Sequence, residues 1–511
     1  MRLPDLSATI VALATPPGLG AIAVIRLSGP DAITIAQSIF FGKKSLAEAR
    51  SHTAHFGTIQ DAGGQLLDEV LATVFRAPHS YTGDDTVEIG CHGSPYIQQE
   101  IIQLCLHSGA RLAQPGEYTM RAFLNGKMDL SQAEAVADLV ASESAAAHAV
   151  ALQQLRGGFK NEIAQLRAEL LHFASMVELE LDFGEEDVEF ADRNALQKLV
   201  EKIRAHLQDL LASFALGNVL KTGVVTVIAG RPNAGKSTLL NALLNEERAI
   251  VSEIPGTTRD TIEETLNIHG VRFRLIDTAG IREAQDQIEA IGVARTMEKI
   301  QQAAILLYVW DVAGGMTLEE VHEDLRRLGQ PLSGQPLRLP LQQDGRPRGV
   351  PVRDVGRPQG APVRIICNKM DRNPLFRAEW LLDPTLPEVH PYLQPTDPDF
   401  EFVPLTADQI IPVSAKNQMN IEFLKENIFQ SVSGGAINLE NTVVTNARHY
   451  EALGQADAAL ADVLQGLESG VTGDFVAQDI RRALYALGEI TGEIGVEEVL
   501  GSIFGKFCIG K

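Results

Sequence analysis

Residues 223–244 read GVVTVIAGRPNAGKSTLLNALL, which is an apolar stretch, a glycine-rich turn and a second apolar stretch in direct succession. The stretch before Gly230 predicts a buried strand, and the one after Lys236 predicts a helix. The turn between them has the spacing of a phosphate-binding loop, in which Gly230 and Gly235 let backbone N–H groups point at phosphate oxygens. Lys236 would neutralise phosphate charge, and Ser237 would offer its hydroxyl to Mg²⁺. The stretch therefore predicts an α/β fold that binds a nucleoside triphosphate.

Two segments further along the chain indicate which base this loop serves. NKMD at 368–371 follows a predicted strand, and SAK at 414–416 follows another. The Asp371 carboxylate can accept hydrogen bonds from both N1–H and the exocyclic amine of guanine, whereas adenine presents the wrong edge and would leave a buried charge unpaired. Backbone donors in SAK suit the guanine oxygen. The predicted substrate is therefore GTP rather than ATP.

Two loops are expected to complete the site near the γ-phosphate. DTAG at 277–280 follows a predicted strand. Asp277 would hold a metal-bound water, and the Gly280 N–H would sense the γ-phosphate. IPGTTRD at 254–260 offers Thr258 as a further Mg²⁺ ligand.

Spacing alone leaves open which residue accelerates hydrolysis. Many GTPases place a glutamine directly after DTAG to orient the attacking water, but Ile281 stands at that position and has no polar group. The alternatives are Arg259 or Arg282 as an arginine finger and Glu283 or Glu289 as the residue that positions water.

Changes of composition along the chain predict a multidomain α/β protein. Residues 1–120 mix short β-rich runs with turns, as in a small α+β domain, whereas 121–221 and 436–511 have apolar residues at helical spacing. Between these helical stretches, 222–435 alternates strands and helices, as in a Ras-like P-loop domain with mostly parallel strands. We expect this domain to be inserted in one all-α helical domain; two separate small bundles are the alternative.

Local patterns predict individual elements within these regions. Apolar runs predict strands at 8–14, 21–29, 67–78 and 85–93. Helical spacing predicts three long helices between 130 and 217 and two more after 440.

Two stretches of the α/β region do not match a packed core. Residues 328–364 are rich in Pro, Gly, Gln and Arg and contain a near repeat, GRPRGVPVR and GRPQGAPVR. They predict a disordered insertion, with a basic RNA-contacting arm as the alternative. The Pro- and acid-rich stretch 372–410 is expected to be a second peripheral loop.

Charge and cysteine content exclude several classes of protein. The formal net charge of −22 disfavours non-specific binding to phosphate backbones, so a nucleic-acid partner would need a local basic patch or would arrive through another protein. Four cysteines without metal-ligand spacing argue against a disulfide framework. Cys91, Cys105 and Cys367 lie in apolar contexts and are expected to be structural. No apolar run reaches the ~18 residues of a membrane-spanning helix, and the N-terminus makes a poor signal peptide, so we expect a cytoplasmic protein.

Beyond these general motifs, the chain resembles the MnmE (TrmE) family of tRNA-modifying GTPases over nearly its whole length. The resemblance rests on ATPPGLGAIAVIRLSG, PGEYTMRAFLNGKMDLSQAEAVADLV, LDFGEEDVEF, GRPNAGKSTLLNALL, GTTRD, DTAGIRE and the terminal FCIGK. It implies a GTP hydrolase that forms a heterotetramer with a flavoprotein partner, MnmG, and places a (carboxymethyl)aminomethyl group on C5 of the wobble uridine, position 34, of certain tRNAs. It also implies a homodimer formed through an N-terminal folate-binding domain, with the one-carbon unit taken from a tetrahydrofolate in its 5-formyl or 5,10-methylene form.

The resemblance also implies how hydrolysis is accelerated. Asn233 matches the family's K⁺-coordinating asparagine. Further K⁺ ligands fall in the first switch loop at Ser252, Ile254 and Thr257. K⁺ at this position would neutralise transition-state charge in place of an arginine finger. Glu289 aligns with the family's catalytic glutamate, which orients the attacking water.

With these positions included, the predicted Mg²⁺ ligands are Ser237 and Thr258. The predicted GTP-binding residues are Asn233, Ala234, Gly235, Lys236, Ser237, Thr238, Ser252, Thr257, Thr258, Asp277, Thr278, Ala279, Gly280, Asn368, Lys369, Asp371, Ser414 and Ala415.

The folate-binding site that the resemblance implies consists of Arg26, Glu88, Lys127 and the terminal Lys511. A carboxylate such as Glu88 is able to pair with the donor edge of a pterin, and cations suit the glutamate tail of the cofactor. Cys508 matches the family's C-terminal cysteine motif. A nucleophile that attacks C6 of uridine is one interpretation of this thiol, and a packed or folate-adjacent thiol is the other.

Two functions of other classes remain as alternatives. A ribosome-assembly GTPase usually carries an RNA-binding module or tandem nucleotide domains, whereas only one GxxxxGKS and one NKxD occur in this chain. A non-enzymatic alternative is a dimeric folate-binding scaffold whose nucleotide domain acts only as a switch. GTP turnover compared in K⁺ and in Na⁺ would separate the enzyme from the scaffold.

Overall fold

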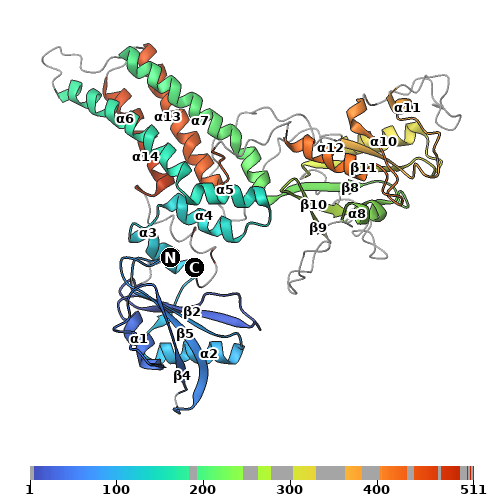
Figure 1. Cartoon of the computed structure of the whole chain (residues 1–511). Coiled ribbons are helices and arrows are strands. Elements are labelled where there is room, and N and C mark those ends of the chain that lie inside the picture. Colours follow the sequence, from blue (N-terminus) through green and yellow to red (C-terminus); the bar gives the residue numbers. More distant parts are fainter. Residues whose placement is uncertain are drawn as a thin grey trace, which may run out of the picture. The chain divides into compact units, whose positions relative to one another are not determined.

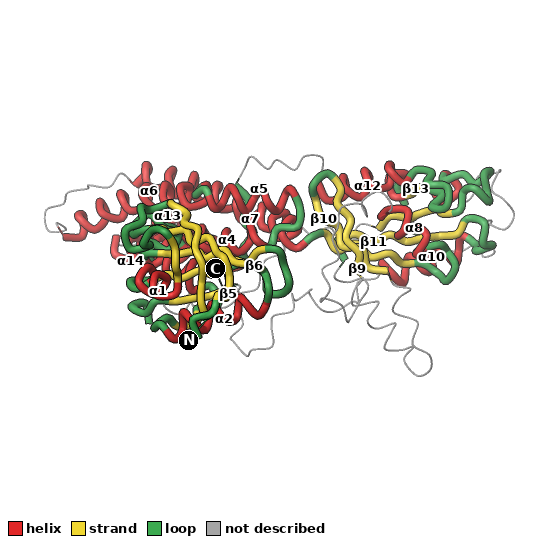
Figure 2. The backbone as a smooth tube through the Cα atoms, turned by 60° about the horizontal axis from the view of Figure 1, so that its bottom comes forward, coloured by secondary structure: helices red, strands yellow, loops and turns green. Residues whose placement is uncertain are grey.

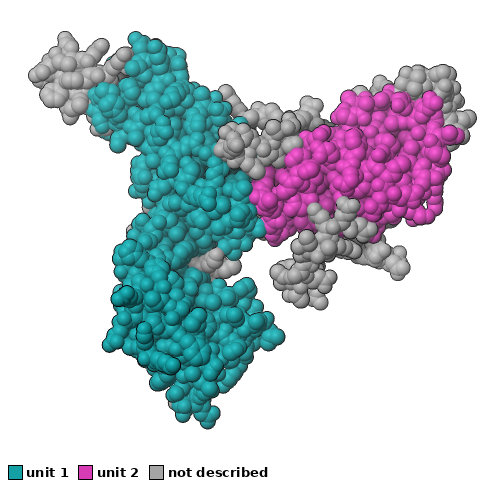
Figure 3. Space-filling model, viewed as in Figure 1, with its two compact units in different colours: residues 1–142, 148–217, 442–511 teal, residues 143–147, 218–441 magenta. Residues whose placement is uncertain are grey.

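The structure, a computed structural model, divides into two compact units (Figure 3). Unit 1 comprises residues 1–142, 148–217 and 442–511, and unit 2 comprises residues 143–147 and 218–441. The residues described are 5–61, 63–182, 193–244, 263–277, 303–329, 363–382, 403, 405–433, 442–469, 473–494, 503, 507 and 510.

The N-terminal part of unit 1 is a seven-stranded sheet in the order β3-β4-β5-β6-β2-β1-β7. Its elements are β1 (Ile10–Leu13), β2 (Ile22–Ser28), α1 (Ala32–Ile39), β3 (Phe40–Gly42), β4 (Thr53–Gln60), β5 (Leu66–Phe75), β6 (Thr86–His92), α2 (Pro95–His107), β7 (Arg111–Leu112) and α3 (Glu117–Leu124). The strands predicted from the four apolar runs are confirmed as β1, β2, β5 and β6. Residues such as Ile25, Ala72 and Ile89 form a core with α1 and α2 on one face of the sheet.

The rest of the described part of unit 1 is mainly helical (Figure 1). Its helices are α4 (Leu130–Val140), α5 (Ala145–Leu155), α6 (Gly158–Asp182), α7 (Arg193–Thr222), α13 (Ala447–Ser469) and α14 (Gly473–Thr491). Helices from both sides of unit 2 in the sequence share one core, in which Leu170 and Ile203 pack with Leu460 and Ile480. In the described part of the chain, no helix is both long enough and apolar enough to cross a membrane.

The prediction of three long helices between 130 and 217 is wrong at its first member, which is two helices. α4 ends at Val140 and α5 begins at Ala145. The Ser144 hydroxyl accepts a hydrogen bond from the Ala147 N–H at 3.1 Å, as an N-cap does, and so starts a new helix. The alanine-rich sequence on both sides hides this break, because alanine favours a helix on either side of it.

Unit 2 contains a six-stranded sheet in the order β13-β12-β11-β8-β10-β9. Its elements are β8 (Val224–Ala229), α8 (Lys236–Leu244), β9 (Glu263–Ile268), β10 (Val271–Asp277), β11 (Ile305–Asp311), α10 (Leu318–Gly329), β12 (Val363–Asn368), α11 (Glu379–Leu382), the short 3₁₀ helix η3 (Ala407–Gln409), β13 (Ile410–Pro412) and α12 (Ile421–Ser433). Every strand pair is parallel except the β9–β10 hairpin. Figure 2 shows this sheet in yellow, with helices in red beside it.

The interpretation of 372–410 as a peripheral loop is wrong for its first part. Phe376, Trp380 and Leu381 are buried and pack with Trp310 of β11. Large apolar side chains within a span of six residues are able to form a core even within a Pro-rich stretch, because burial of their area outweighs the poor helix-forming composition. Most of the predicted insertion 328–364 lies outside the described residues.

A buried ion-pair cluster joins α4 to α13 in unit 1. Arg448 donates to both Glu134 carboxylate oxygens at 3.0 Å, and His449 lies 2.7 Å from one of them. Burial opposes ionisation of Glu134, but the charges and hydrogen bonds of His449 and Arg448 outweigh it and lower the pKa of Glu134 from 4.5 to about 2. Ionised Glu134 therefore stabilises the packing of these two helices.

We expect Glu134→Gln to lower the stability of unit 1 at neutral pH by ~2–4 kcal/mol, because the partly buried Arg448 loses its counter-charge. The folded-state pKa lies below the unfolded value of 4.5, so the contribution is present above pH 4.5 and is lost as the pH falls towards 2. Thermal unfolding of both proteins at pH 7 and near pH 3 measures this difference. Glu201→Gln, on an exposed position of α7, is the matched control; a deficit of equal size at both pH values would contradict the assignment.

Candidate functional site

The segments predicted to bind a nucleotide follow strands of the parallel part of the unit 2 sheet. The phosphate loop follows β8, Asp277 ends β10, the NKMD segment starts at the end of β12, and SAK follows β13. Carboxyl ends of parallel strands meet at one edge, and ligands of open α/β sheets bind there. The described parts of the four segments therefore share this edge.

Two glycines fix the path of the phosphate loop. Gly230 has φ +145°, and a Cβ added there would lie 2.3 Å from the Val309 carbonyl oxygen of β11. Gly235 has φ +95°, and its added Cβ would lie 2.4 Å from the Asn368 side-chain amide. No other residue fits either position without moving the backbone. The loop is therefore pressed against β11 and the end of β12, as close backbone packing of a phosphate loop requires.

The first turn of α8 carries the cation and the hydroxyl predicted for the phosphates and the metal ion. Lys236 is mostly buried, and its ammonium donates to the carbonyl oxygens of Gly230 and Arg231, both at 3.0 Å. The Ser237 hydroxyl donates to an Asp277 carboxylate oxygen at 3.3 Å. The helix N-terminus adds backbone N–H groups and a favourable dipole for an anion.

Asn368 joins three strand ends behind this loop. Its side-chain N–H donates to the Ala234 carbonyl at 2.9 Å, and its side-chain oxygen accepts from the Ala415 N–H at 3.1 Å. Lys369 lies beside it, and its ammonium donates to the Asn233 carbonyl at 2.8 Å and pairs with Asp311 of β11 at 2.6 Å. The NKMD segment therefore contacts both the phosphate loop and the SAK segment, in addition to its predicted role in binding the base.

Asp371 is exposed, and one of its carboxylate oxygens accepts a hydrogen bond. The Ser414 hydroxyl donates to it at 2.7 Å, and this hydrogen bond lowers the pKa of the Asp371 carboxyl. The carboxylate is therefore ionised at neutral pH, in the state that accepts two hydrogen bonds from guanine.

Part of the predicted site lies outside the described residues. These residues are Ser252, Ile254, Thr257, Thr258, Thr278, Ala279, Gly280, Glu289, Cys508 and Lys511. Thr238, the remaining predicted nucleotide contact, lies exposed in the first turn of α8.

The second predicted site centres on an ion pair between neighbouring strands of unit 1. Arg26 of β2 and Glu88 of β6 are register partners, and their side chains meet at 2.7 Å. The Arg26 guanidinium also lies 5.7 Å from the ring centre of Tyr81 and 5.6 Å from that of Tyr118, within cation–π range. It donates to the Gly510 carbonyl at 3.4 Å, which brings the C-terminal segment to this site.

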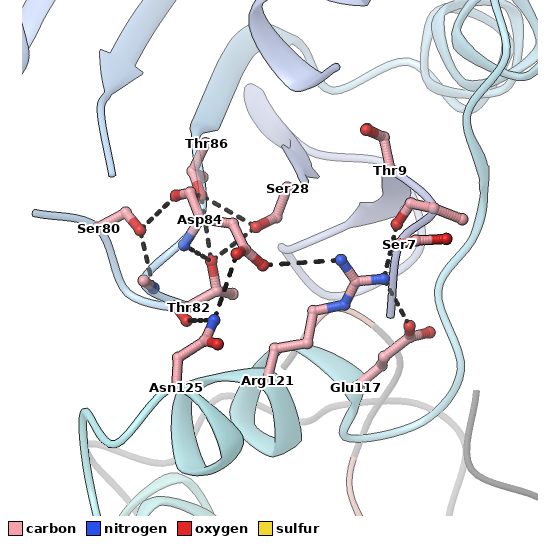
Figure 4. A network of polar contacts seen from close by, with 12 residues as sticks. Ser7, Thr9, Ser28, Ser80, Thr82, Asp84, Thr86, Glu117, Arg121 and Asn125 are labelled. Atoms are coloured by element: carbon pink, nitrogen blue, oxygen red, sulfur yellow. Dashed lines mark hydrogen bonds and ion pairs between the residues drawn. The ribbon is translucent and has the colours of Figure 1, made fainter. Parts of the chain in front are cut away.

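A partly buried polar network supports the loop that carries Tyr81 (Figure 4). Arg121 of α3 is buried, lies 3.0 Å from Glu117 and 3.7 Å from Asp84, and donates to the Ala8 carbonyl. Asn125 donates to the Thr82 carbonyl at 2.7 Å. These contacts fasten residues 80–86 to α3, and Tyr81 is held further by its hydroxyl, 2.9 Å from that of Thr119.

Lys127 does not lie in the ion pair of Arg26 and Glu88 but donates to the Pro78 carbonyl at 2.8 Å and is otherwise exposed. The thiols of Cys91, Cys105 and Cys367 are buried. Burial raises the pKa of Cys91 to about 11 and that of Cys105 to about 12, so these two are neutral thiols.

Sequence reasoning missed several residues of both sites. Asp311, which holds Lys369, ends an apolar strand, and an acidic residue at a strand end was a usable signal. Tyr81 and Tyr118 gave no such signal, because their place beside Arg26 depends on contacts between residues more than 50 positions apart.

Comparison with known proteins gives the family. The chain is 50% identical over 505 residues to the tRNA modification GTPase MnmE of Cytophaga hutchinsonii, covering 98% of both chains. It belongs to the MnmE (TrmE) family. Its identity to the MnmE of Christiangramia forsetii is 52% over 517 residues, covering all of both chains. The family profile described as GTP-binding protein TrmE N-terminus matches residues 9–127, and that of the MnmE helical domain matches residues 130–508.

A crystallised GTP-binding protein from Sulfolobus solfataricus in complex with GDP is also similar, at 19% identity over 54% of this chain and 68% of its own. The TM-score of 0.26 is too low for this likeness to bear on the fold.

Asp371→Asn is expected to change the base preference of the site. The amide would place an N–H₂ donor against the exocyclic amine of guanine, whereas xanthine has a carbonyl acceptor at the same carbon. We expect the affinity for GDP to fall ~100-fold or more and that for xanthosine diphosphate to rise. Competition against a fluorescent GDP analogue measures both. Asp408→Asn, an exposed carboxyl in η3 of the same unit, is the control; an unchanged ratio of the two affinities in Asp371→Asn would contradict the assignment.

Proposed function

We propose that this chain is a K⁺-stimulated GTP hydrolase that acts with a flavoprotein partner on the wobble uridine of certain tRNAs, in the cytoplasm. The observation that carries the proposal is a pair of contacts beside the phosphate loop, in a chain that belongs to the MnmE family. Asn368 donates to the loop, and Ser414 holds the Asp371 carboxylate that is proposed to bind the base. The relatives named above are called tRNA modification GTPases, which supports the same activity and target here.

The proposed arrangement has four parts: 1–120, 121–221, 222–435 and 436–511. The third would be a nucleotide domain inserted in one helical domain formed by the second and fourth. The core that α6 and α7 share with α13 and α14 supports the single helical domain, because two separate bundles would each need a core of their own.

The base and phosphate contacts follow from the chain's own groups. Ionised Asp371 accepts from guanine N1–H and the exocyclic amine, and backbone N–H groups of the SAK segment other than that of Ala415, which is bonded to Asn368, are proposed to donate to the guanine oxygen. Lys236 exchanges its carbonyl partners for β- and γ-phosphate oxygens, and the N-terminus of α8 donates backbone N–H groups.

The donor groups fit the two cations of the proposal. Ser237 and Asp277 bring a hydroxyl and a carboxylate within 3.3 Å of each other, and oxygen ligands of this kind suit Mg²⁺. The Asn233 side chain is exposed from a left-handed turn with φ 63°, so that its amide oxygen is available to a cation beside the phosphates. Mg²⁺ and K⁺, when bound, supply positive charge where the transferring phosphoryl group develops negative charge.

In the proposed hydrolysis, side chains of this protein have three roles. Lys236 holds the phosphates in line, Glu289 is proposed to orient the attacking water, and Thr258 is proposed to complete the Mg²⁺ shell together with Ser237. The further K⁺ ligands Ser252, Ile254 and Thr257 belong to the same proposal. No arginine is assigned to the transition state.

The folate part of the proposal rests on the Arg26–Glu88 pair. Glu88 offers a carboxylate to a donor edge, and the partly buried ring of Tyr81 beside the guanidinium offers flat apolar surface to a pterin. Tyr118 is fully buried and only packs against the guanidinium. Lys127, Lys511 and, as a nucleophile, Cys508 complete the set that the family resemblance implies. A bound tetrahydrofolate would supply the one-carbon unit.

A homodimer through the N-terminal sheet has support from exposed apolar side chains on one face of that sheet. Ile22 and Phe56 are exposed on β2 and β4, and Leu71 on β5 and Phe41 on β3 are half exposed. Strand alternation puts Ile22 on the same face as Arg26 and Glu88, opposite to the core with α1 and α2. An apolar face of this kind is buried when a second copy packs on it.

The experiment that tests the tRNA role is the composition of wobble nucleosides in a strain that lacks this chain. We expect the C5 substituent of the target tRNAs to disappear and to return when the intact chain is supplied. Mass spectrometry of digested tRNA measures it. Normal modification in the deletion strain would refute the assignment, and loss of ribosomal subunits with intact tRNA would point to the ribosome-assembly alternative.

Asn233→Ala is expected to remove the K⁺ effect on GTP hydrolysis while leaving binding of GDP within about threefold, because the side-chain oxygen contacts only the added cation. Steady-state turnover in KCl and in NaCl, for both proteins, measures this. Equal and negligible rates of the parent protein in both salts would favour the switch scaffold, and a K⁺ effect that persists in Asn233→Ala would exclude this residue as a ligand.

A further inference from the structure

Arg231, the second residue of the phosphate loop, is held by two carboxylates from one helix. Its Nε donates to Asp324 at 2.8 Å and one terminal nitrogen lies 3.4 Å from the other oxygen of the same carboxylate. Its other terminal nitrogen donates to Glu320 at 2.8 Å. All three nitrogens of the guanidinium thus face α10, which is a side-on fork that a lysine could not reproduce.

The two carboxylates are themselves fixed. Glu320 accepts from the Thr317 N–H at 3.0 Å and donates its own N–H to the Thr317 hydroxyl at 3.2 Å, the reciprocal capping box at the start of α10. Asp324 also accepts from the hydroxyl of buried Tyr308 at 2.8 Å. Tyr308 lies on β11, paired with Ala229 at the end of β8. The clamp on Arg231 is therefore rigid on the side of the helix and the sheet.

The backbone of Arg231 forms part of the seat for the phosphate-binding lysine. Its carbonyl accepts from the Lys236 ammonium at 3.0 Å and from the Ala234 N–H at 3.3 Å. A loop with glycines at both ends loses much conformational entropy when it adopts a single conformation. A side chain fastened between these glycines reduces the number of shapes the free loop samples.

We propose that Arg231 is a positioning residue, and that its clamp to Asp324 and Glu320 pre-forms the phosphate loop for the diphosphate part of a guanine nucleotide. This inference rests on the proposed nucleotide site. The clamp contacts the loop at Arg231, whereas the base contacts of Asp371 and Asn368 belong to other strand ends. Loosening it should therefore weaken binding of phosphates without weakening binding of the base.

The test compares a ligand that has phosphates with one that has none, in the full chain. Glu320→Gln keeps the capping box, which accepts glutamine at that position, and removes only the charge that faces Arg231. Asp324→Asn removes the bidentate partner. Glu323→Gln is the matched control, because Glu323 lies on the same helix and pairs with Arg327 rather than with the loop.

Affinities for GDP and for guanosine are measured by competition against N-methylanthraniloyl-GDP, whose release rate is followed by stopped flow. We expect Asp324→Asn to weaken GDP binding about fivefold and to speed GDP release, a modest effect because the Arg231 side chain is 37% exposed. Glu320→Gln should act in the same direction, guanosine should stay within twofold, and Arg231→Lys should recover part of the loss that Arg231→Gln causes.

Two other results would contradict the proposed role of the clamp. Equal losses for GDP and guanosine would mean a general loss of structure, and unchanged GDP affinity in both carboxylate variants would mean that the loop forms without the clamp. If Asp324→Asn fails to fold, Glu320→Gln alone decides. A parent protein that bound neither ligand would instead refute the proposed nucleotide site itself.

Discussion

The Asn368 side chain is the contact on which the nucleotide site depends, because it bonds to two backbone groups from different strand ends. Its amide satisfies the Ala234 carbonyl of the phosphate loop and the Ala415 N–H after β13, and it is buried with only 2% of its surface exposed. Without it both backbone groups would be buried and unpaired, at about 1–3 kcal/mol each. The missing Cβ of Gly235 makes room for this amide. A glycine at position 235 and an asparagine at position 368 are therefore required together, because a side chain on residue 235 would occupy the space of the Asn368 amide.

Cations around both candidate sites are paired with carboxylates before any ligand binds. Lys369 pairs with Asp311, Arg231 with Asp324, and Arg26 with Glu88. Each pair fixes a long side chain in one place and lowers the entropy that ligand binding would otherwise cost. It also removes much of the positive potential, which agrees with a net charge of −22 in a chain proposed to bind anionic ligands. Backbone N–H groups at the start of α8, together with Lys236, are then the main attraction for phosphate.

The sequence predicted what is set by local patterns. β8, the loop and α8 follow from one run of 22 residues, and β10, β12 and β13 from apolar runs that end in polar residues. β9 was missed because Glu263, Glu264 and Asn267 break its apolar pattern; it is an antiparallel edge strand, which needs only one buried face. The start of α5 was missed because one serine N-cap in an alanine-rich run carries little signal. Polar contacts between distant residues could not be predicted, since Arg231 and Asp324 are 93 positions apart.

The same limit explains why more of the nucleotide site than of the site in unit 1 was predictable from the residues alone. In the nucleotide site the described groups lie at a strand end, in the loop after it or in the first turn of α8. The chain order alone therefore places Asp277, Asp371 and Ser414 at one edge of a parallel sheet. In unit 1 the sheet is largely antiparallel, and a residue's neighbours depend on register. Arg26 faces Glu88 only because β2 and β6 pair with Ile25 opposite Ile89. A shift of either strand by one residue would turn its own side chain, Arg26 or Glu88, into the core with α1 and α2. The buried face of that sheet, rather than any motif, therefore brings Arg26 and Glu88 together.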